Sequence, residues 1–164
     1  MPCREKLNCE NSINGTTKKL LEVTPPDVKN ILTRFKDKEI MDSWFGRYTY
    51  GDPAHLDYHL AETLEKPPEE WNAVFRNPEQ MMFSIYNSED LHVGESNVAI
   101  EESLSDGQIS ILFGKREWWD HGYGNQTLQE TMIIYFETVG LFRVLADIPK
   151  YNTRAIHVFQ TQVL

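Results

Sequence analysis

The stretch QISILFGKREWWDHGYGNQTLQE, residues 108–130, decides how the rest of this sequence is interpreted. Apolar residues alternate at its start and predict a strand over 108–114. Two tryptophans and Gly122-Tyr123-Gly124 follow, and apolar residues then recur at helical spacing over 125–140. A strand, a glycine turn and a helix N-terminus are a common phosphate-binding arrangement, because the first-turn N–H groups are unpaired and carry a partial positive charge.

Two glycine motifs with known phosphate-binding roles do not fit this turn. The Rossmann fingerprint needs G-x-G-x-x-G, and Thr127 stands at its third glycine position. The P-loop needs a Gly-Lys-Ser/Thr sequence, which does not occur in the chain. Gly-x-Gly by itself is also typical of an ordinary tight turn between a strand and a helix, so this motif alone leaves both interpretations open.

The rest of the sequence predicts an α+β (mixed α/β) domain. We expect a short strand at 19–23, a helix from Asp27, a helix at about 53–65, strands at 81–87 and 92–101, a strand at 142–149 ended by Pro149, and a last helix capped by Asn152. Gly140 stands where a helix C-cap belongs. We expect residues 1–19 to form a flexible polar tail and residues 20–164 to form a single domain.

The charge and the hydropathy of the chain exclude several classes of partner. A net charge of −9 argues against nucleic acid, because a phosphate backbone needs a basic face. A helix that spans a bilayer needs about 20 consecutive apolar residues, and no stretch of this sequence approaches that length. The N-terminus also lacks the apolar segment of a secretory signal. We therefore expect a cytoplasmic protein with no membrane partner, and the acidic balance allows a cationic substrate such as an amine.

The histidines do not form a metal-binding motif. His55 and His59 are four residues apart on a predicted helix, but no H-E-x-x-H pattern surrounds them. We expect no metal site.

Two motifs together carry a resemblance to a known family. W-x-x-G-Y-G at 119–124, the helix after it, and RVLADIPKYNTRAIHVF at 143–159 resemble the GNAT superfamily of acyl-coenzyme A N-acetyltransferases, in particular its RimJ/RimL-type branch. The family's phosphate signature is [Q/R]-x-x-G-x-[G/A], and its second marker, Asn-x-x-[A/S]-[I/R], matches residues 152–156. The resemblance covers roughly residues 20–160. It implies a mostly antiparallel, twisted central sheet flanked by helices and splayed where the cofactor enters.

The resemblance implies an acetyl-CoA-dependent N-acetyltransferase in which a primary amine attacks the thioester directly. The acceptor would be an amine-bearing small molecule or a peptide N-terminus. The alternative is a catalytically silent module that binds acyl-CoA and whose sheet is completed by a partner subunit. A homodimer is one remedy for an exposed edge of the strand 142–149.

The resemblance also assigns residues to the acyl-CoA site. The backbone of strand 108–114 would bind the pantetheine arm, and the turn after it would hold the pyrophosphate. The predicted cofactor-binding residues are Ile111, Leu112, Phe113, Gly114, Trp119, Asp120, His121, Gly122, Tyr123, Gly124, Asn125 and Asn152.

The sequence departs from the family pattern at two places. Trp119 stands where the family has Gln or Arg, and the last residues, QTQVL, replace the family's Gly-Phe and one or two further strands. A tyrosine that serves as general acid in the family has no equivalent, and His157 and Gln160 are unsupported candidates. As possible general bases we considered Asp147, which is slightly better placed, and three glutamates that we expect to be solvated: Glu95, Glu101 and Glu102. No catalytic residue is assigned.

Overall fold

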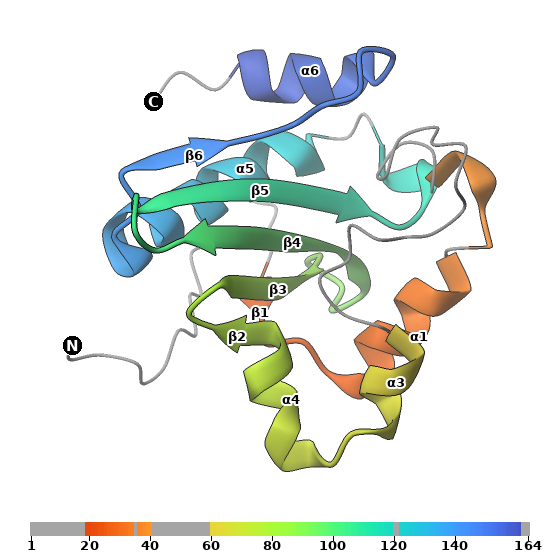
Figure 1. Cartoon of the computed structure of the whole chain (residues 1–164). Coiled ribbons are helices and arrows are strands. Elements are labelled where there is room, and N and C mark those ends of the chain that lie inside the picture. Colours follow the sequence, from red (N-terminus) through yellow and green to blue (C-terminus); the bar gives the residue numbers. More distant parts are fainter. Residues whose placement is uncertain (1–18, 35, 41–59, 120–121, 162–164) are drawn as a thin grey trace.

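The computed structural model describes residues 19–34, 36–40, 60–119 and 122–161 (Figure 1). Residues 1–18 of the predicted tail, and most of the helix predicted at 53–65, lie outside the described residues. In chain order, the elements are β1 (Lys19–Leu21), α1 (Pro25–Arg34), α3 (Leu60–Glu65), α4 (Pro68–Phe75), β2 (Arg76–Asn77), β3 (Gln80–Tyr86), β4 (His92–Glu101), β5 (Asp106–Phe113), a 3-10 turn (Arg116–Trp118), α5 (Tyr123–Ile133), a π-helical turn (Ile134–Val139), β6 (Arg143–Leu145) and α6 (Thr153–Gln160).

Within the described ranges, the strands form a six-stranded sheet, which confirms the predicted mixed α+β class. Its order is β1-β3-β4-β5-β6, with β2 also pairing with β3. Only β5 and β6 are parallel, and the other neighbours are antiparallel. Figure 1 shows β6 and α6 on the side of β5 that faces away from β4.

The sheet splays between its last two strands. The register of β6 with β5 covers only Asp106–Gln108 opposite Arg143–Leu145, whereas β5 continues to Phe113. The strand predicted at 142–149 is therefore shorter than expected. Beyond Leu145 the chain leaves the sheet, and the carbonyl of Pro149 accepts a hydrogen bond from the Asn152 N–H in the turn before α6.

Apolar side chains cover both faces of the sheet. On one face, α5 and the π-helical turn contribute Leu128, Met132 and Tyr135 to a core with strand residues such as Phe83 and Ile109. A second buried cluster joins α1 and α4 to β3; its buried members are Val23, Val28, Ile31, Trp71, Phe75 and Met82. Burial of this apolar area is what holds the helices on the sheet.

The helix ends follow from local chemistry. Asn152 caps α6 as predicted, because its Oδ1 accepts a hydrogen bond from the Ala155 N–H at 3.2 Å. Gly140 has φ +80°, the left-handed conformation that ends a helix, which confirms its predicted capping role. The helix α4 was not predicted from the sequence; it begins at Pro68, and proline is tolerated at a first helical position. Within the part of the chain that the structure describes, every helix is too short or too polar to cross a membrane.

Candidate functional site

Among the described residues, no strand pairs with the C-terminal half of β5 on the side away from β4. The N–H of Gly114 donates to the Val93 carbonyl at 3.0 Å, so at this position the backbone faces β4. Polar groups of successive residues in a strand point to opposite sides, so the backbone groups of Ile111 and Phe113 face the other edge. β6 does not reach that far along β5. This edge can therefore receive an extended ligand as an additional strand.

A cavity of about 420 Å³ lies beside this edge, between β5, the turn before α5, and α6. Its size is that of a site for a small organic ligand. The structure brings eight of the predicted cofactor-binding residues to its wall: Ile111, Leu112, Phe113, Trp119, Gly122, Gly124, Asn125 and Asn152. Asp120 and His121 lie outside the described residues, as do His55 and His59.

Two predicted residues have neighbours other than the cavity. Tyr123 begins α5, and its ring lies 6.3 Å from that of Phe113, measured between centroids. Gly114 lies under the side chain of Arg34, and a Cβ at this glycine would come within 2.0 Å of the Arg34 Cδ. Gly114 is a glycine because α1 packs against it.

The glycines before and within α5 have different reasons to lack a side chain. Gly122 is the residue before the helix, has φ +76°, and an added Cβ would meet nothing within 4 Å. Its carbonyl accepts the first helical hydrogen bond, from the Gln126 N–H at 3.2 Å. A Cβ at Gly124 would lie 3.2 Å from Val158 of α6, so this glycine lets α6 approach. Gly122 faces open space at a helix N-terminus, which fits a bound diphosphate.

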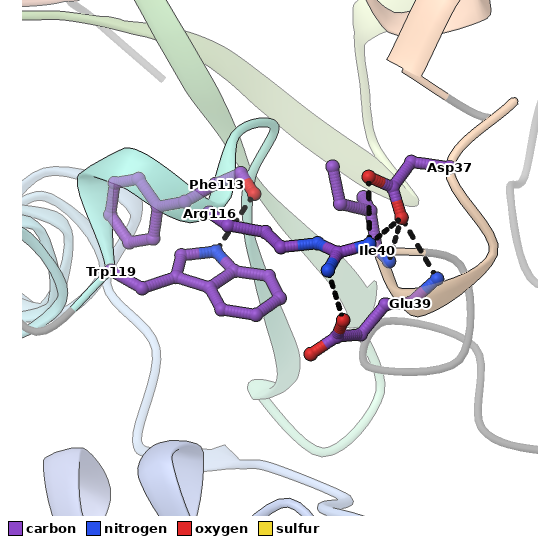
Figure 2. A network of polar contacts seen from close by, with 6 residues as sticks. All are labelled: Asp37, Glu39, Ile40, Phe113, Arg116 and Trp119. Atoms are coloured by element: carbon purple, nitrogen blue, oxygen red, sulfur yellow. Dashed lines mark hydrogen bonds and ion pairs between the residues drawn. The ribbon is translucent and has the colours of Figure 1, made fainter.

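Trp119 links β5 to α6 across the cavity wall. Its indole Nε1 donates a hydrogen bond to the Phe113 carbonyl at 3.3 Å, as Figure 2 shows. The guanidinium carbon of Arg154, at the start of α6, lies 3.6 Å from the centroid of the Trp119 ring. This distance is that of a cation–π contact.

Most of the contribution of α6 to the cavity, and that of Trp118, was not predicted from the sequence. The residues that were not assigned are Trp118, Arg154, Ala155, His157, Val158 and Phe159. His157, considered only as an unsupported acid, is thus at the wall. The helical spacing of Ala155, Val158 and Phe159 is the signal that could have identified one face of this helix.

An ion-pair network ties the 3-10 turn to the segment after α1 (Figure 2). The Arg116 Nη2 lies 3.0 Å from the Asp37 Oδ1, and its Nη1 lies 2.6 Å from the Glu39 Oε2. The hydrogen bond from Arg116 lowers the pKa of the Asp37 carboxyl and, in turn, raises the pKa of Arg116. The turn that carries Trp119 is thus connected to a segment about 80 residues earlier in the chain.

A polar network around the buried Asp27 joins the start of α1 to β3. The Asp27 carboxylate accepts hydrogen bonds from the Ser84 Oγ at 2.9 Å, from the Tyr86 hydroxyl, and from the Thr24 N–H and Oγ1. Burial raises the pKa of Tyr86 to about 12, and its hydrogen bond to Asp27 adds to this shift. The cluster fixes the start of α1 on the sheet.

The acidic residues considered as general bases lie in different environments. Glu95 is only 1% exposed, so the expectation that it is solvated is wrong: its position in the central strand β4 buries it. Burial lowers the pKa of Arg34, and the negative charge of Glu95 opposes that shift. Glu101 and Glu102 are exposed, as expected. Asp147 lies outside β6, and its carboxylate accepts a hydrogen bond from the Gln108 Nε2 at 2.8 Å.

Comparisons with known proteins place this fold. A spermidine N-acetyltransferase from Vibrio cholerae, solved in complex with CoA and spermine, matches with a TM-score of 0.68 and 16% identity, over 87% of this chain and 78% of that chain. A domain from Methanocaldococcus jannaschii matches with a TM-score of 0.65 and 18% identity, over 90% of this chain and 87% of that chain. At these identities the likeness shows the fold.

A comparison at the level of sequence gives the family. No curated protein matches the sequence. The sequence profile of the acetyltransferase (GNAT) domain matches residues 19–162, which is most of the chain. This chain therefore belongs to the GNAT acetyltransferase family.

Proposed function

We propose that this protein, as a RimJ/RimL-type GNAT enzyme, transfers an acetyl group from acetyl-CoA to a primary amine by direct attack. The observation that carries the proposal is the edge of β5 that β6 leaves without a strand partner among the described residues, beside a cavity that also reaches the first turn of α5. An extended arm and a diphosphate need these two features side by side.

Each part of the wall has a role in this proposal. The backbone groups of Ile111 and Phe113 bind the pantetheine arm, and the N–H groups at the start of α5 hold the diphosphate over Gly122. Asn152 lies at the wall and also caps α6, so it fixes the position of that helix. When bound, acetyl-CoA supplies the activated acyl carbon.

The proton of the attacking amine needs an acceptor. Among the acidic residues considered, Glu95 alone is buried, and its register partner Leu112 lines the cavity. We assign Glu95 as the group that takes this proton.

An amine-bearing small molecule is the acceptor we favour. Two lines support it: the net charge of −9, and the fold shared with a spermidine N-acetyltransferase solved with spermine. A peptide N-terminus is the other acceptor to test.

Self-association is part of the proposal because β6 is an edge strand. Leu145 on this strand is 50% exposed, and the preceding Phe142 is 85% exposed. One neighbour in fold is described as a dodecamer. Sedimentation velocity over a range of concentrations measures whether copies of this chain associate; a monomer at all concentrations would contradict it.

The function is tested by two measurements. Isothermal titration with acetyl-CoA should give saturable binding, and its absence would overturn the proposal. A free-thiol release assay over an amine panel, including spermidine and ribosomal-protein N-terminal peptides, should then give turnover. Binding without turnover on any amine would favour the silent acyl-CoA-binding module.

A further inference from the structure

We infer that Trp119 is a positioning residue that competes with the pantetheine arm of acyl-CoA for the carbonyl of Phe113. The inference rests on the proposed function, because it assumes that the arm binds to the edge of β5. In this inference, Trp119 lowers the affinity of the protein for acyl-CoA by competing with the pantetheine arm.

The direction of the Phe113 carbonyl is the first step. The N–H of the next residue, Gly114, donates to Val93 on β4. Because backbone groups alternate along a strand, the carbonyl of Phe113 points away from β4, toward the cavity. It is the last acceptor of β5 on the edge that an additional strand would use.

The donor to this carbonyl is the second step. The Trp119 Nε1 lies 3.3 Å from the Phe113 oxygen, and Trp119 itself lines the cavity. Neighbouring strands lie about 4.8 Å apart, so an indole nitrogen at this distance occupies the space where an added strand would run. The carbonyl can therefore serve either the indole or the arm.

The third step is what holds the indole in place. Arg154 of α6 lies over the Trp119 ring at 3.6 Å. The hydrogen bond and this contact together join β5 to α6 at the cavity wall. Binding of the arm must break the hydrogen bond between the Trp119 indole and the Phe113 carbonyl. The indole must then move relative to Arg154 or to β5.

The test compares Trp119→Phe with Trp118→Phe as a matched control. Phenylalanine at 119 keeps an aromatic ring for Arg154 but removes the N–H donor. Trp118 also lines the cavity, but the cations near its ring are Arg34 and Lys115, not Arg154. Calorimetry with acetyl-CoA should show about two- to tenfold tighter binding for Trp119→Phe, the range expected when one hydrogen bond need not be broken. Trp118→Phe should show no gain.

A second probe separates the arm from the nucleotide. Adenosine 3′-phosphate 5′-diphosphate lacks the arm, so its affinity should be the same for the wild type and Trp119→Phe. In an NMR spectrum, the indole N–H signal of Trp119 is the one that is missing from Trp119→Phe. In the wild type, this N–H should exchange faster with solvent after acetyl-CoA is added. The variant serves only to assign this signal, and the exchange rate itself is measured on the wild-type chain.

Two results have different meanings. Suppose that acetyl-CoA binds the wild type. If it then binds Trp119→Phe equally or more weakly, or if the exchange of the Trp119 indole N–H does not change, this inference is overturned and the proposed function stands. No binding of acetyl-CoA to the wild type would overturn both.

Discussion

Arg34 packs directly on Gly114. A Cβ at this glycine would lie 2.0 Å from the Arg34 Cδ and 2.4 Å from its Nη1. The Arg34 Nη2 donates to the His92 carbonyl at 2.6 Å, and its guanidinium carbon lies 5.3 Å from the Trp118 ring centroid. The end of α1 is thus attached to the start of β4 and to a residue of the cavity wall.

Gly114→Ala should destabilise the protein because the methyl group would displace Arg34. Overpacking of this kind costs about 1–3 kcal/mol of unfolding free energy, measured by urea denaturation. The matched control repeats the substitution in an Arg34→Ala background, where the space is free. Equal costs in the two backgrounds would show that Arg34 is not what excludes a side chain at this position.

His92 should make the stability depend on pH. Burial lowers the pKa of His92 to about 4 from the ordinary 6.5; the nearby Asp27 carboxylate opposes this shift, and Arg34 adds to it. Between these values the unfolded chain binds a proton that the folded chain does not. The free energy of unfolding therefore falls as the pH decreases from about 6.5 to about 4, by at most about 1.4 kcal/mol per pH unit.

The contribution of His92 is isolated by His92→Leu. The His92 Nδ1 lies 3.8 Å from the Asp27 Oδ1, and neither ring nitrogen meets the geometry of a hydrogen bond within the described residues, so the main effect of the substitution is to remove the titration. Urea denaturation at several pH values should give a shallower slope for the variant between pH 4 and 6.5. Identical slopes would mean that His92 titrates normally.

Local signals were enough to predict the elements around the site. Asn152 and Gly140 could be placed because capping depends on a few neighbouring residues. Alternating apolar residues predicted the strand that becomes β5. The burial of Leu128 and Met132 follows from their helical spacing.

The features that the sequence did not reveal depend on distant contacts. Glu95 is buried because β4 is central in the sheet, which cannot be determined from the strand's own residues. Gly114 was predicted as a cofactor-binding residue, and its close contact with Arg34, 80 positions earlier, could not be predicted. The contact between Trp119 and Arg154 likewise joins two elements whose packing no local pattern predicts.

Glu95→Gln should lower kcat if Glu95 accepts the proton of the amine. Loss of a general base costs about 10²–10⁴-fold, and the pH–rate profile should lose its acidic limb. The affinity for acetyl-CoA should remain, which calorimetry checks. Glu101→Gln, at the exposed end of the same strand, is the control and should leave kcat unchanged. A Glu95→Gln variant with normal kcat would exclude this role.

Gly122 and Gly124 should respond differently to a bulky side chain. At Gly122 an added side chain would project into open space in front of the α5 N-terminus. Asparagine tolerates positive φ, so Gly122→Asn should keep the fold. It should weaken acetyl-CoA binding at least about tenfold, because the side chain would occupy the space of the diphosphate. At Gly124 even a methyl group would meet Val158 at 3.2 Å, so Gly124→Val should also lower stability by pushing α6 away. Calorimetry and urea denaturation of both variants measure the two effects separately. Full affinity in a folded Gly122→Asn protein would mean that the diphosphate binds elsewhere.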